Sequence, residues 1–217
     1  MIKKLFENED LIAVDKPEGL ASIPEGTKGK ETLLSLLQEQ FTEKLYVVHR
    51  LGKLASGVIV FAKNADAHRY LNGQFSDRAV TRTYLAVTHG VLKRASGTIN
   101  KPLREFGSGR MGFDHRQGKP SITKFQVMNR FGDCTLVKAH PLTGTRHQIR
   151  VHLYNIGHPI AGDTLYGDKA AQSGFPRLML HAQEIMFRLP SGEEVKIISP
   201  IPASFRSVLA DLKSPAY

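Results

Sequence analysis

The stretch Val47–Lys63 reads VVHRLGKLASGVIVFAK and places apolar, β-branched runs on either side of a polar middle. β-Branched residues favour strands, and a short polar segment with glycine favours a turn, so the stretch predicts strand, turn, strand. The turn carries His49, Arg50 and Lys53 but no carboxylate. Gly52 stands at its centre, where a nucleophile would need a side chain. The turn is therefore predicted to present cations without a reactive acid.

The overall composition indicates a folded, basic protein. The chain has 217 residues, of which 41% are hydrophobic, so it can build a core as one large domain or two small ones. Thirty Lys and Arg residues against twenty Asp and Glu residues give a net charge of +10. This excess favours a polyanionic partner, nucleic acid first and an anionic membrane surface second. Charge alone leaves open a merely basic protein.

Cysteine content and hydropathy argue against a disulfide-linked, cysteine–zinc, secreted or membrane-spanning protein. Cys134 is the only cysteine, so neither an intramolecular disulfide nor a cysteine-rich zinc site is expected. Its strand-like surroundings predict a packed residue rather than a nucleophile. The N-terminus lacks the apolar core of a signal peptide, and no apolar run reaches the roughly 18 residues that span a bilayer. We therefore expect a cytoplasmic protein with no membrane partner.

Apolar periodicity and turn signals divide the chain into short elements. Strands are predicted at 11–14, 45–48, 58–62, 83–87, 121–129, 134–140, 178–188 and 195–198, helices at 31–41, 65–75, 146–154 and 202–212, and a loop or hairpin insertion at 100–120. Strands outnumber helices and mostly follow one another directly. This order predicts an α+β fold with a largely antiparallel or mixed sheet. Because no linker interrupts the pattern, one domain over residues 1–217 is expected.

The predicted helix at 146–154 carries Arg146 and Arg150, which are four residues apart and would share one face. Two such cations need an anion between them, either an RNA phosphate or a buried carboxylate, unless they form a solvated basic face. His147 and His152 do not match the H-E-x-x-H zinc pattern. The other histidines lack ligand spacing, so no metal site is expected.

Two further features suit nucleic acid. Tyr84 interrupts the apolar run TYLAV, either as a core tyrosine with its hydroxyl at the edge or as a stacking platform for an extruded base. The 100–120 segment is basic and suits a phosphate backbone, although a solvated loop is the alternative; its cations are Lys101, Arg104, Arg110, Arg116 and Lys119. No phosphate-binding loop, dinucleotide fingerprint or G-x-S-x-G motif occurs, so no cofactor is expected.

The polar segments together resemble the RluA-type pseudouridine synthases, which isomerise uridine in RNA to its C-glycoside. The matching pieces, in the family's order, are DKPEG, VVHRL…SG, RTYLAV, GKPSITKF, TG..HQIRVHL, GHPIAGDTLYG and RLMLHA, from Asp15 to Ala182. The resemblance implies a mixed, mostly antiparallel sheet flanked by helices, with a cleft for RNA. Many relatives carry an N-terminal RNA-binding domain, which this chain is expected to lack.

The resemblance also implies roles for individual residues. Arg50 matches the arginine that fills the stack when the target base flips out, Tyr84 the tyrosine that packs against that base, and Arg150 the arginine that pairs with the catalytic aspartate. The family reads HRLD, and Gly52 occupies the position of that nucleophilic aspartate. Residues expected to contact RNA are Arg50, His49, Arg146, His147, Lys101, Arg104, Arg110 and Lys119.

Nearby positions depart from the family pattern as well. Leu54 and Ala55 replace an acidic residue and a threonine, and Thr145 stands where arginine usually follows the glycine. Arg146 comes one position later, which is a displacement of about 100° around a helix. Without the aspartate, Arg150 lacks its expected partner. Because a buried unpaired arginine is costly, we expect it to find another carboxylate, an ordered anion or water.

Three functions follow as hypotheses. The first is an RluA-type isomerase acting on ribosomal or transfer RNA, which uses an unusual acid, with Asp15 and Asp163 as candidates, or retains weak activity. The second is an RNA-binding pseudoenzyme that holds or remodels RNA. The third, a protein-interaction scaffold without RNA, is disfavoured by the +10 charge. A monomer is expected in each case.

Overall fold

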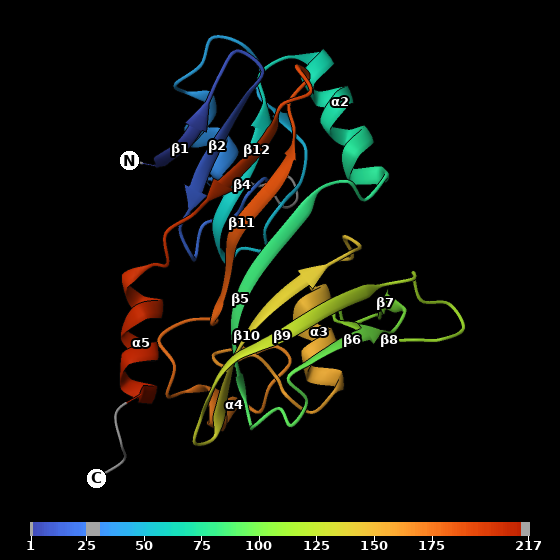
Figure 1. Cartoon of the computed structure of the whole chain (residues 1–217), viewed down its shortest axis with the longest axis vertical. Helices are drawn as coiled ribbons and strands as arrows, with labels where there is room; N and C mark the ends of the chain where they lie inside the picture. Colours follow the sequence, from blue (N-terminus) through green and yellow to red (C-terminus); the bar gives the residue numbers. More distant parts are fainter. Residues whose placement is uncertain (1, 25–30, 214–217) are drawn as a thin grey trace. The chain divides into compact units, whose positions relative to one another are not determined.

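A computed structural model describes residues 2–24 and 31–213, which divide into two compact units (Figure 1). Unit 1 lies within Met1–Arg82 and His181–Pro200, and unit 2 within Thr83–Leu180 and Ile201–Tyr217. Each unit is thus assembled from segments far apart in the sequence. The expectation of a single domain over residues 1–217 stays a prediction.

Unit 1 is built on a mixed sheet with strand order β1-β2-β4-β11, with β12 beside β11 and β3 beside β4. Among the strand pairs described in this unit, β4 and β11 alone run parallel. The elements are β1 (Lys3–Glu7), β2 (Leu11–Lys16), α1 (Leu33–Gln38), β3 (Tyr46–Val47), β4 (Ser56–Ala62), α2 (Ala65–Ser76), β11 (Leu180–Arg188) and β12 (Glu194–Ile198).

The core of unit 1 forms around β4, whose seven residues are all buried. An unbroken apolar run is typical of a strand covered on both faces, and SGVIVFA is such a run. Val58 and Val60 pack in one cluster with Leu71 of α2. The helix begins where the Asn64 side chain accepts a hydrogen bond from the Ala67 N–H at 2.8 Å.

The start of β4 explains why serine and glycine precede its apolar run. Gly57 has φ +119°, and a Cβ atom there would lie 2.1 Å from the Ala182 carbonyl oxygen, so only glycine allows β11 to approach. Beside it, Ser56 Oγ lies 2.9 Å from His181 Nδ1, and both side chains are buried. These contacts hold the end of the 48–55 loop, which connects β3 to β4.

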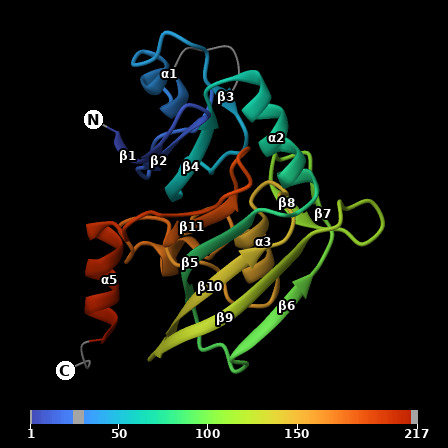
Figure 2. The same ribbon diagram turned by 45° about the horizontal axis from the view of Figure 1, so that its top comes forward.

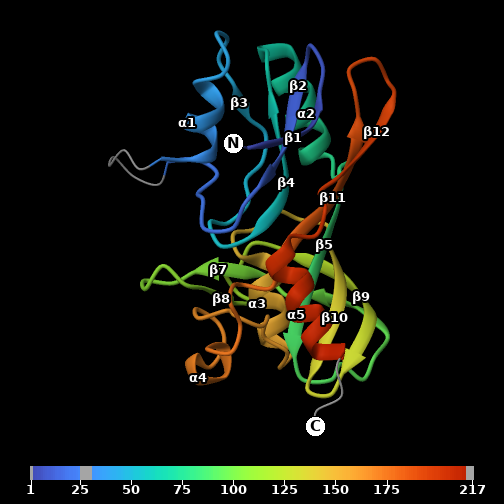
Figure 3. The same cartoon turned by 90° about the vertical axis from the view of Figure 1, so that its left-hand side faces the viewer.

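Unit 2 contains an antiparallel sheet with strand order β5-β10-β9-β6 (Figure 2). A two-stranded hairpin of β7 and β8 lies beside α3 (Figure 3). The elements are β5 (Thr81–His89), β6 (Ser96–Asn100), β7 (Leu103–Glu105), β8 (Met111–Phe113), β9 (Ile122–Phe131), β10 (Cys134–Pro141), α3 (Gln148–Asn155), α4 (Lys169–Gln172) and α5 (Ala203–Lys213).

Cys134 opens β10 and is 1% exposed. Burial, reinforced by the neighbouring Asp133 charge, raises the pKa of its thiol to about 11. A thiol that stays protonated at neutral pH is a poor nucleophile. The prediction of a packed cysteine is therefore confirmed.

Most predicted elements are present, and the α+β fold with a mixed, mostly antiparallel sheet flanked by helices is confirmed. The basic 100–120 segment contains the β7–β8 hairpin, as expected. Sequence patterns missed β1, β6 and α4. The helix predicted at 146–154 was wrong at its start: α3 begins at Gln148, because His147 adopts a left-handed conformation with φ 54°.

Candidate active site

The 48–55 loop in unit 1 is anchored through its backbone. Ser22 Oγ donates to the Leu51 carbonyl at 2.8 Å and accepts from the Leu51 N–H at 3.1 Å. The Gly19 N–H donates to the Lys53 carbonyl at 2.9 Å. These bonds use backbone groups and one serine, so none of them depends on a side chain at position 52.

Lys16, in the DKPEG segment, supports the same loop. Its side chain is fully buried, and Nζ donates to the carbonyls of Pro17 and Leu20 at 2.8 Å and of Lys53 at 3.2 Å. A buried ammonium group is tolerated when carbonyl oxygens replace its hydration shell. Lys16 therefore ties the turn after β2 to the centre of the 48–55 loop.

His49 serves the fold of unit 1. Its Nε2 accepts a hydrogen bond from the Val60 N–H at 3.0 Å, and its ring stacks on Phe75 with centroids 5.1 Å apart. Burial, aided by the positive charge of Arg82, lowers the pKa of His49 to about 3. The ring is therefore neutral at pH 7 and carries its proton on Nδ1. Its predicted contact with RNA stays a prediction.

Gly52 is exposed, and a Cβ atom added there would meet no atom within 4 Å. Its φ lies outside the left-handed region, so an L-residue there would not suffer the strain of a left-handed backbone. The neighbouring Arg50 is also exposed, whereas Leu51 is 5% exposed and packs inward. The loop thus presents Arg50 and an empty, accessible position.

Arg150 of α3, in unit 2, forms a bidentate ion pair with Asp163. Arg150 Nε lies 2.7 Å from Asp163 Oδ2, and Nη2 lies 2.7 Å from Oδ1. The side chains are 8% and 0% exposed, respectively. The expectation that Arg150 would find another carboxylate, an ordered anion or water is confirmed, and its partner is the carboxylate of Asp163.

Asp163 is fully committed within unit 2. Besides Arg150, its Oδ1 accepts the backbone N–H groups of Leu165 at 3.0 Å and Tyr166 at 3.1 Å. Tyr166 extends the cluster: the Arg150 guanidinium lies 4.9 Å from its ring centroid, and its hydroxyl lies 2.8 Å from His147 Nδ1. Burial raises the pKa of the Tyr166 hydroxyl. The cluster is closely packed, with a charge-neutral Arg150–Asp163 pair at its centre.

The other polar residues of HQIRVH hold the surrounding backbone. Gln148 Oε1 accepts from Thr143 Oγ1 at 2.7 Å and from the Thr145 N–H at 3.0 Å, which closes the turn before α3. His152, with no exposed surface, lies 2.8 Å from Thr123 Oγ1 and 3.0 Å from the Lys101 carbonyl oxygen. Gln148 and His152 therefore stabilise the fold around α3.

Arg146 does not share a helical face with Arg150, contrary to the sequence expectation. It precedes α3, in the turn before His147, so neither the four-residue spacing nor the 100° displacement applies. Its Nη1 instead lies 2.9 Å from Glu105 Oε1 of the β7–β8 hairpin, in a pair that is about half exposed. Arg146 thus links the turn to the hairpin.

The β7–β8 hairpin and the segment that follows it carry several of the predicted RNA-contacting cations. Arg110 and Lys119 are exposed, and the Arg110 guanidinium lies 5.5 Å from the Tyr166 ring centroid. Arg104 pairs with Asp114 at 3.3 Å and covers the Phe106 ring at 4.8 Å. Arg110, Arg146, His147 and Arg150 are therefore gathered around Tyr166 and the hairpin, within unit 2.

Tyr84 lies on β5 of unit 2, opposite Ala139 of β10, and is partly buried. Its neighbours Thr83 and Leu85 are buried, as the alternation of a strand requires. The choice between a core tyrosine and a stacking platform stays open. Gly52 and Arg50 belong to unit 1, whereas Tyr84 and Arg150 belong to unit 2.

Sequence reasoning missed two members of the unit 2 cluster, Tyr166 and Glu105. Tyr166 follows Asp163 by three residues within GDTLYG, so the quoted motif already contained it. Glu105 stands in the basic 100–120 segment, where an acidic residue among cations signals an ion pair.

Over residues 2–24 and 31–213, no group of three His, Cys, Asp or Glu side chains is placed to hold a metal ion. The same residues include no helix long and apolar enough to cross a membrane.

Comparison with known proteins identifies the relatives of this arrangement. Residues 10–155 match the family model described as RNA pseudouridylate synthase. A ribosomal large subunit pseudouridine synthase C from Vibrio parahaemolyticus is 36% identical over 220 residues, covering 96% of this chain and 69% of that protein. The MG209 homolog RNA pseudouridine synthase of Mycoplasma pneumoniae is 40% identical over 192 residues. That match covers 86% of this chain and only 62% of the relative's length.

A solved structure of the human protein RNA pseudouridylate synthase domain containing 4 is similar in fold. Its TM-score is 0.82 at 26% sequence identity, and the match covers 97% of this chain and 93% of that one. The match therefore includes parts of both units.

Proposed function

This chain belongs to the RNA pseudouridylate synthase family, in its RluA and RluC branch, and we propose that it binds RNA without isomerising uridine. In the family resemblance, position 52 is that of the aspartate that attacks the target nucleotide. The proposal rests on Gly52, which stands there instead.

The missing side chain removes a chemical step. A carboxylate nucleophile divides a difficult substitution into two easier steps through a covalent intermediate. Glycine supplies no acid, base or nucleophile. Losing a group that acts together with its neighbours can lower a rate by about a million-fold. RNA binding has no such requirement, since it depends mainly on cations and stacking surfaces.

The two candidate substitutes are already engaged. Asp163 is fully buried between Arg150 and two backbone N–H groups. Asp15 accepts a hydrogen bond from Ser199 Oγ at 2.7 Å. Moving Asp163 toward a substrate would leave a buried arginine unpaired, which is costly. These contacts support the absence of a replacement nucleophile.

The cationic and aromatic parts remain for RNA. Arg50 is exposed beside Gly52, and Arg110 and Lys119 are exposed in unit 2. We propose that Arg50 fills the stack left by an extruded base and that Tyr84 packs on that base, as the resemblance implies. The net charge of +10 supports long-range attraction of RNA.

Similarity to an enzyme named for the ribosomal large subunit supports ribosomal RNA as the partner, with transfer RNA as the alternative. We further propose a cytoplasmic protein that acts as a monomer and as one domain.

The test measures tritium release from RNA labelled at C5 of uridine. Isomerisation breaks the N1–C1′ bond, forms a C5–C1′ bond and releases the C5 hydrogen to water. Native protein, Gly52→Asp and Gly52→Asn are compared on total RNA from a strain lacking the gene. The open space at position 52 accommodates both side chains. We expect release with Gly52→Asp alone, because asparagine matches its shape without its nucleophilic carboxylate.

Release by the native protein would overturn the proposal and indicate an isomerase that uses another acid, to be sought with Asp15→Asn and Asp163→Asn. If none of the three proteins releases tritium and the native protein binds RNA in a salt-dependent way, the RNA-binding function is supported. Absence of RNA binding at low salt would refute it and favour the protein-interaction scaffold.

A further inference from the structure

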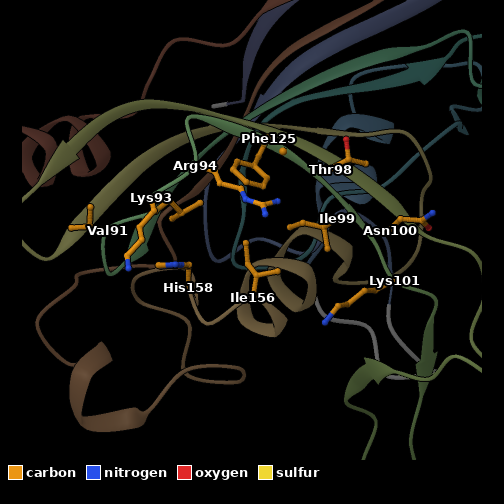
Figure 4. A pocket seen from close by; sticks show the side chains of 12 residues that line it. Val91, Lys93, Arg94, Thr98, Ile99, Asn100, Lys101, Phe125, Ile156 and His158 are labelled. Carbon is orange, nitrogen blue, oxygen red and sulfur yellow. The ribbon is translucent and has the colours of Figure 1, made fainter.

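Unit 2 contains a pocket whose lining does not include Arg150, Asp163 or Tyr166. Its volume is about 700 Å³, and its lining comes from the β5–β6 connection, β6, β9 and the chain after α3 (Figure 4). One lining residue, Ile156, follows Arg150 by six positions, which is about 9 Å along a helix axis. The pocket is therefore at the opposite end of α3 from the residues that precede the helix.

The floor of the pocket is apolar. Ile99 of β6 and Phe125 of β9 are 4% and 8% exposed, and Ile156 is partly buried beside them. Gly97 allows the Phe125 ring to lie against β6, because a Cβ atom there would be 2.8 Å from the ring. A firm apolar floor favours a ligand with a flat or apolar face.

The rim of the pocket is cationic. Lys93, Arg94 and Lys101 line it, and none of its twelve lining residues is acidic. Figure 4 shows the Arg94 guanidinium extending into the space between Phe125 and Ile156. Within the part of the chain that the structure describes, no hydrogen bond or ion pair engages the Arg94 side chain. Arg94 and Lys93 are exposed at this rim. A guanidinium that borders an apolar floor without a carboxylate partner favours an anionic ligand.

Neutral polar groups complete the lining. His158 Nδ1 lies 2.9 Å from the His89 carbonyl oxygen and donates to it, which leaves Nε2 for a ligand. Thr98 and Asn100 are exposed at the other side (Figure 4). These groups can donate hydrogen bonds to the edge of a heterocycle and accept hydrogen bonds from it. A simple fatty anion has no such edge, so it would leave these groups unused.

We propose that this pocket binds one nucleoside monophosphate unit, with the base on the Phe125–Ile156 floor and the phosphate at Arg94 and Lys93. Its volume lies within the roughly 300–1,000 Å³ typical of small-molecule sites. The unit comes either from a free nucleotide or from an unpaired nucleotide of bound RNA. The second source rests on the proposed function and deepens it by adding a separate grip on RNA.

Calorimetric titration of the full chain with adenosine 5′-monophosphate tests the shared chemistry. Adenosine and ribose 5-phosphate are titrated in parallel, since each keeps only half of the recognised groups. Arg94→Gln is compared with Arg206→Gln, an equal charge change at an exposed residue of α5. We expect Arg94→Gln to weaken adenosine 5′-monophosphate binding about tenfold, Arg206→Gln to leave it unchanged, and both fragments to bind more weakly.

RNA binding then separates the two sources. If RNA displaces adenosine 5′-monophosphate and Arg94→Gln also weakens RNA binding, the pocket holds a nucleotide of the RNA. If the native protein binds adenosine 5′-monophosphate but RNA does not displace it, the ligand is a free nucleotide. The latter result is obtained even if the protein binds no RNA, so failure of the proposed function is distinguishable.

Two results would overturn the proposal. One is the absence of heat or competition with adenosine 5′-monophosphate in the native protein, combined with equal RNA affinity of Arg94→Gln and Arg206→Gln. The other is equal weakening of adenosine 5′-monophosphate binding by the two substitutions, because that would indicate attraction by overall charge. Circular dichroism and thermal unfolding of each variant establish that the compared proteins are folded.

Discussion

The 48–55 loop in unit 1 and the Arg150 cluster in unit 2 both contain positions to which the family resemblance assigns catalytic roles, but the side chains at these positions contribute differently to the fold. The loop is held by Ser22 and Lys16 through backbone groups, and Gly52 contacts nothing through a side chain. Arg150, in contrast, is buried in a bidentate pair with Asp163.

This contrast separates residues needed for chemistry from residues needed for the fold. A nucleophile at an exposed loop position can be lost without opening a cavity or stranding a charge. The Arg150–Asp163 pair cannot be broken without leaving a buried charge. Retention of Arg150 is therefore no sign of catalysis, whereas Gly52 bears directly on it.

The largest expected effect comes from breaking the buried pair. Asp163→Asn leaves Arg150 without its counter-charge and should lower the free energy of unfolding by about 3–5 kcal/mol. Urea denaturation measures the change. Asp66→Asn is the matched control, because the Asp66–Arg69 pair is 89% and 78% exposed and should contribute less than about 1 kcal/mol. Equal effects of the two substitutions would show that the buried pair contributes no more to stability than the exposed pair.

Two glycines near each other in the sequence, Gly52 of the 48–55 loop and Gly57 of β4, test the same contrast between an open and a packed position. Gly57→Ala places a methyl group against the Ala182 carbonyl at φ +119° and should cost about 3 kcal/mol through strain and overpacking. Gly52→Ala meets open space and should stabilise by up to about 1 kcal/mol, because alanine restricts the unfolded chain. Thermal unfolding compares both with the native protein. Substantial destabilisation by Gly52→Ala would show that position 52 supports the fold.

The loop region also predicts a pH dependence. The pKa of His49 is lowered to about 3 from 6.5, so between these values the unfolded chain binds the proton and the folded chain does not. Stability from His49 is thus complete above pH 6.5 and falls with acidification by up to about 1.4 kcal/mol per pH unit.

Urea denaturation of native protein and His49→Gln between pH 7 and pH 4 measures this contribution. Glutamine keeps an acceptor for the Val60 N–H but does not titrate, so the variant should show a shallower slope. Parallel slopes for the two proteins would rule out the lowered pKa.

The smallest effect concerns the cluster's exposed rim. Arg146→Gln should change the free energy of unfolding by less than about 1 kcal/mol, because its pair with Glu105 is half exposed. It should reduce the slope of log RNA affinity against log salt by about one, as loss of one phosphate contact does. Glu105→Gln keeps the cation and serves as the control. An unchanged slope in Arg146→Gln would remove Arg146 from the RNA-contacting set.

Local patterns in the sequence predicted the elements where neighbouring residues decide the structure. The apolar run of β4 and the paired strands β9 and β10 follow directly from such patterns. The start of α3 did not, because the left-handed conformation of His147 is accompanied by a contact with Tyr166, which lies 19 residues away. Burial of Lys16 was equally invisible, since a lysine is ordinarily exposed.

The amino-acid sequence alone determines that position 52 supplies no nucleophile, because glycine has no reactive side chain in any fold. The net charge, and hence the preference for a polyanion, is a matter of composition alone. The partner of Arg150 was decided only by the tertiary structure. The sequence contains several carboxylates that could pair with Arg150. Asp163 is the partner because the turn that follows α3 places its carboxylate against the guanidinium, and the backbone N–H groups of Leu165 and Tyr166 donate to the same carboxylate.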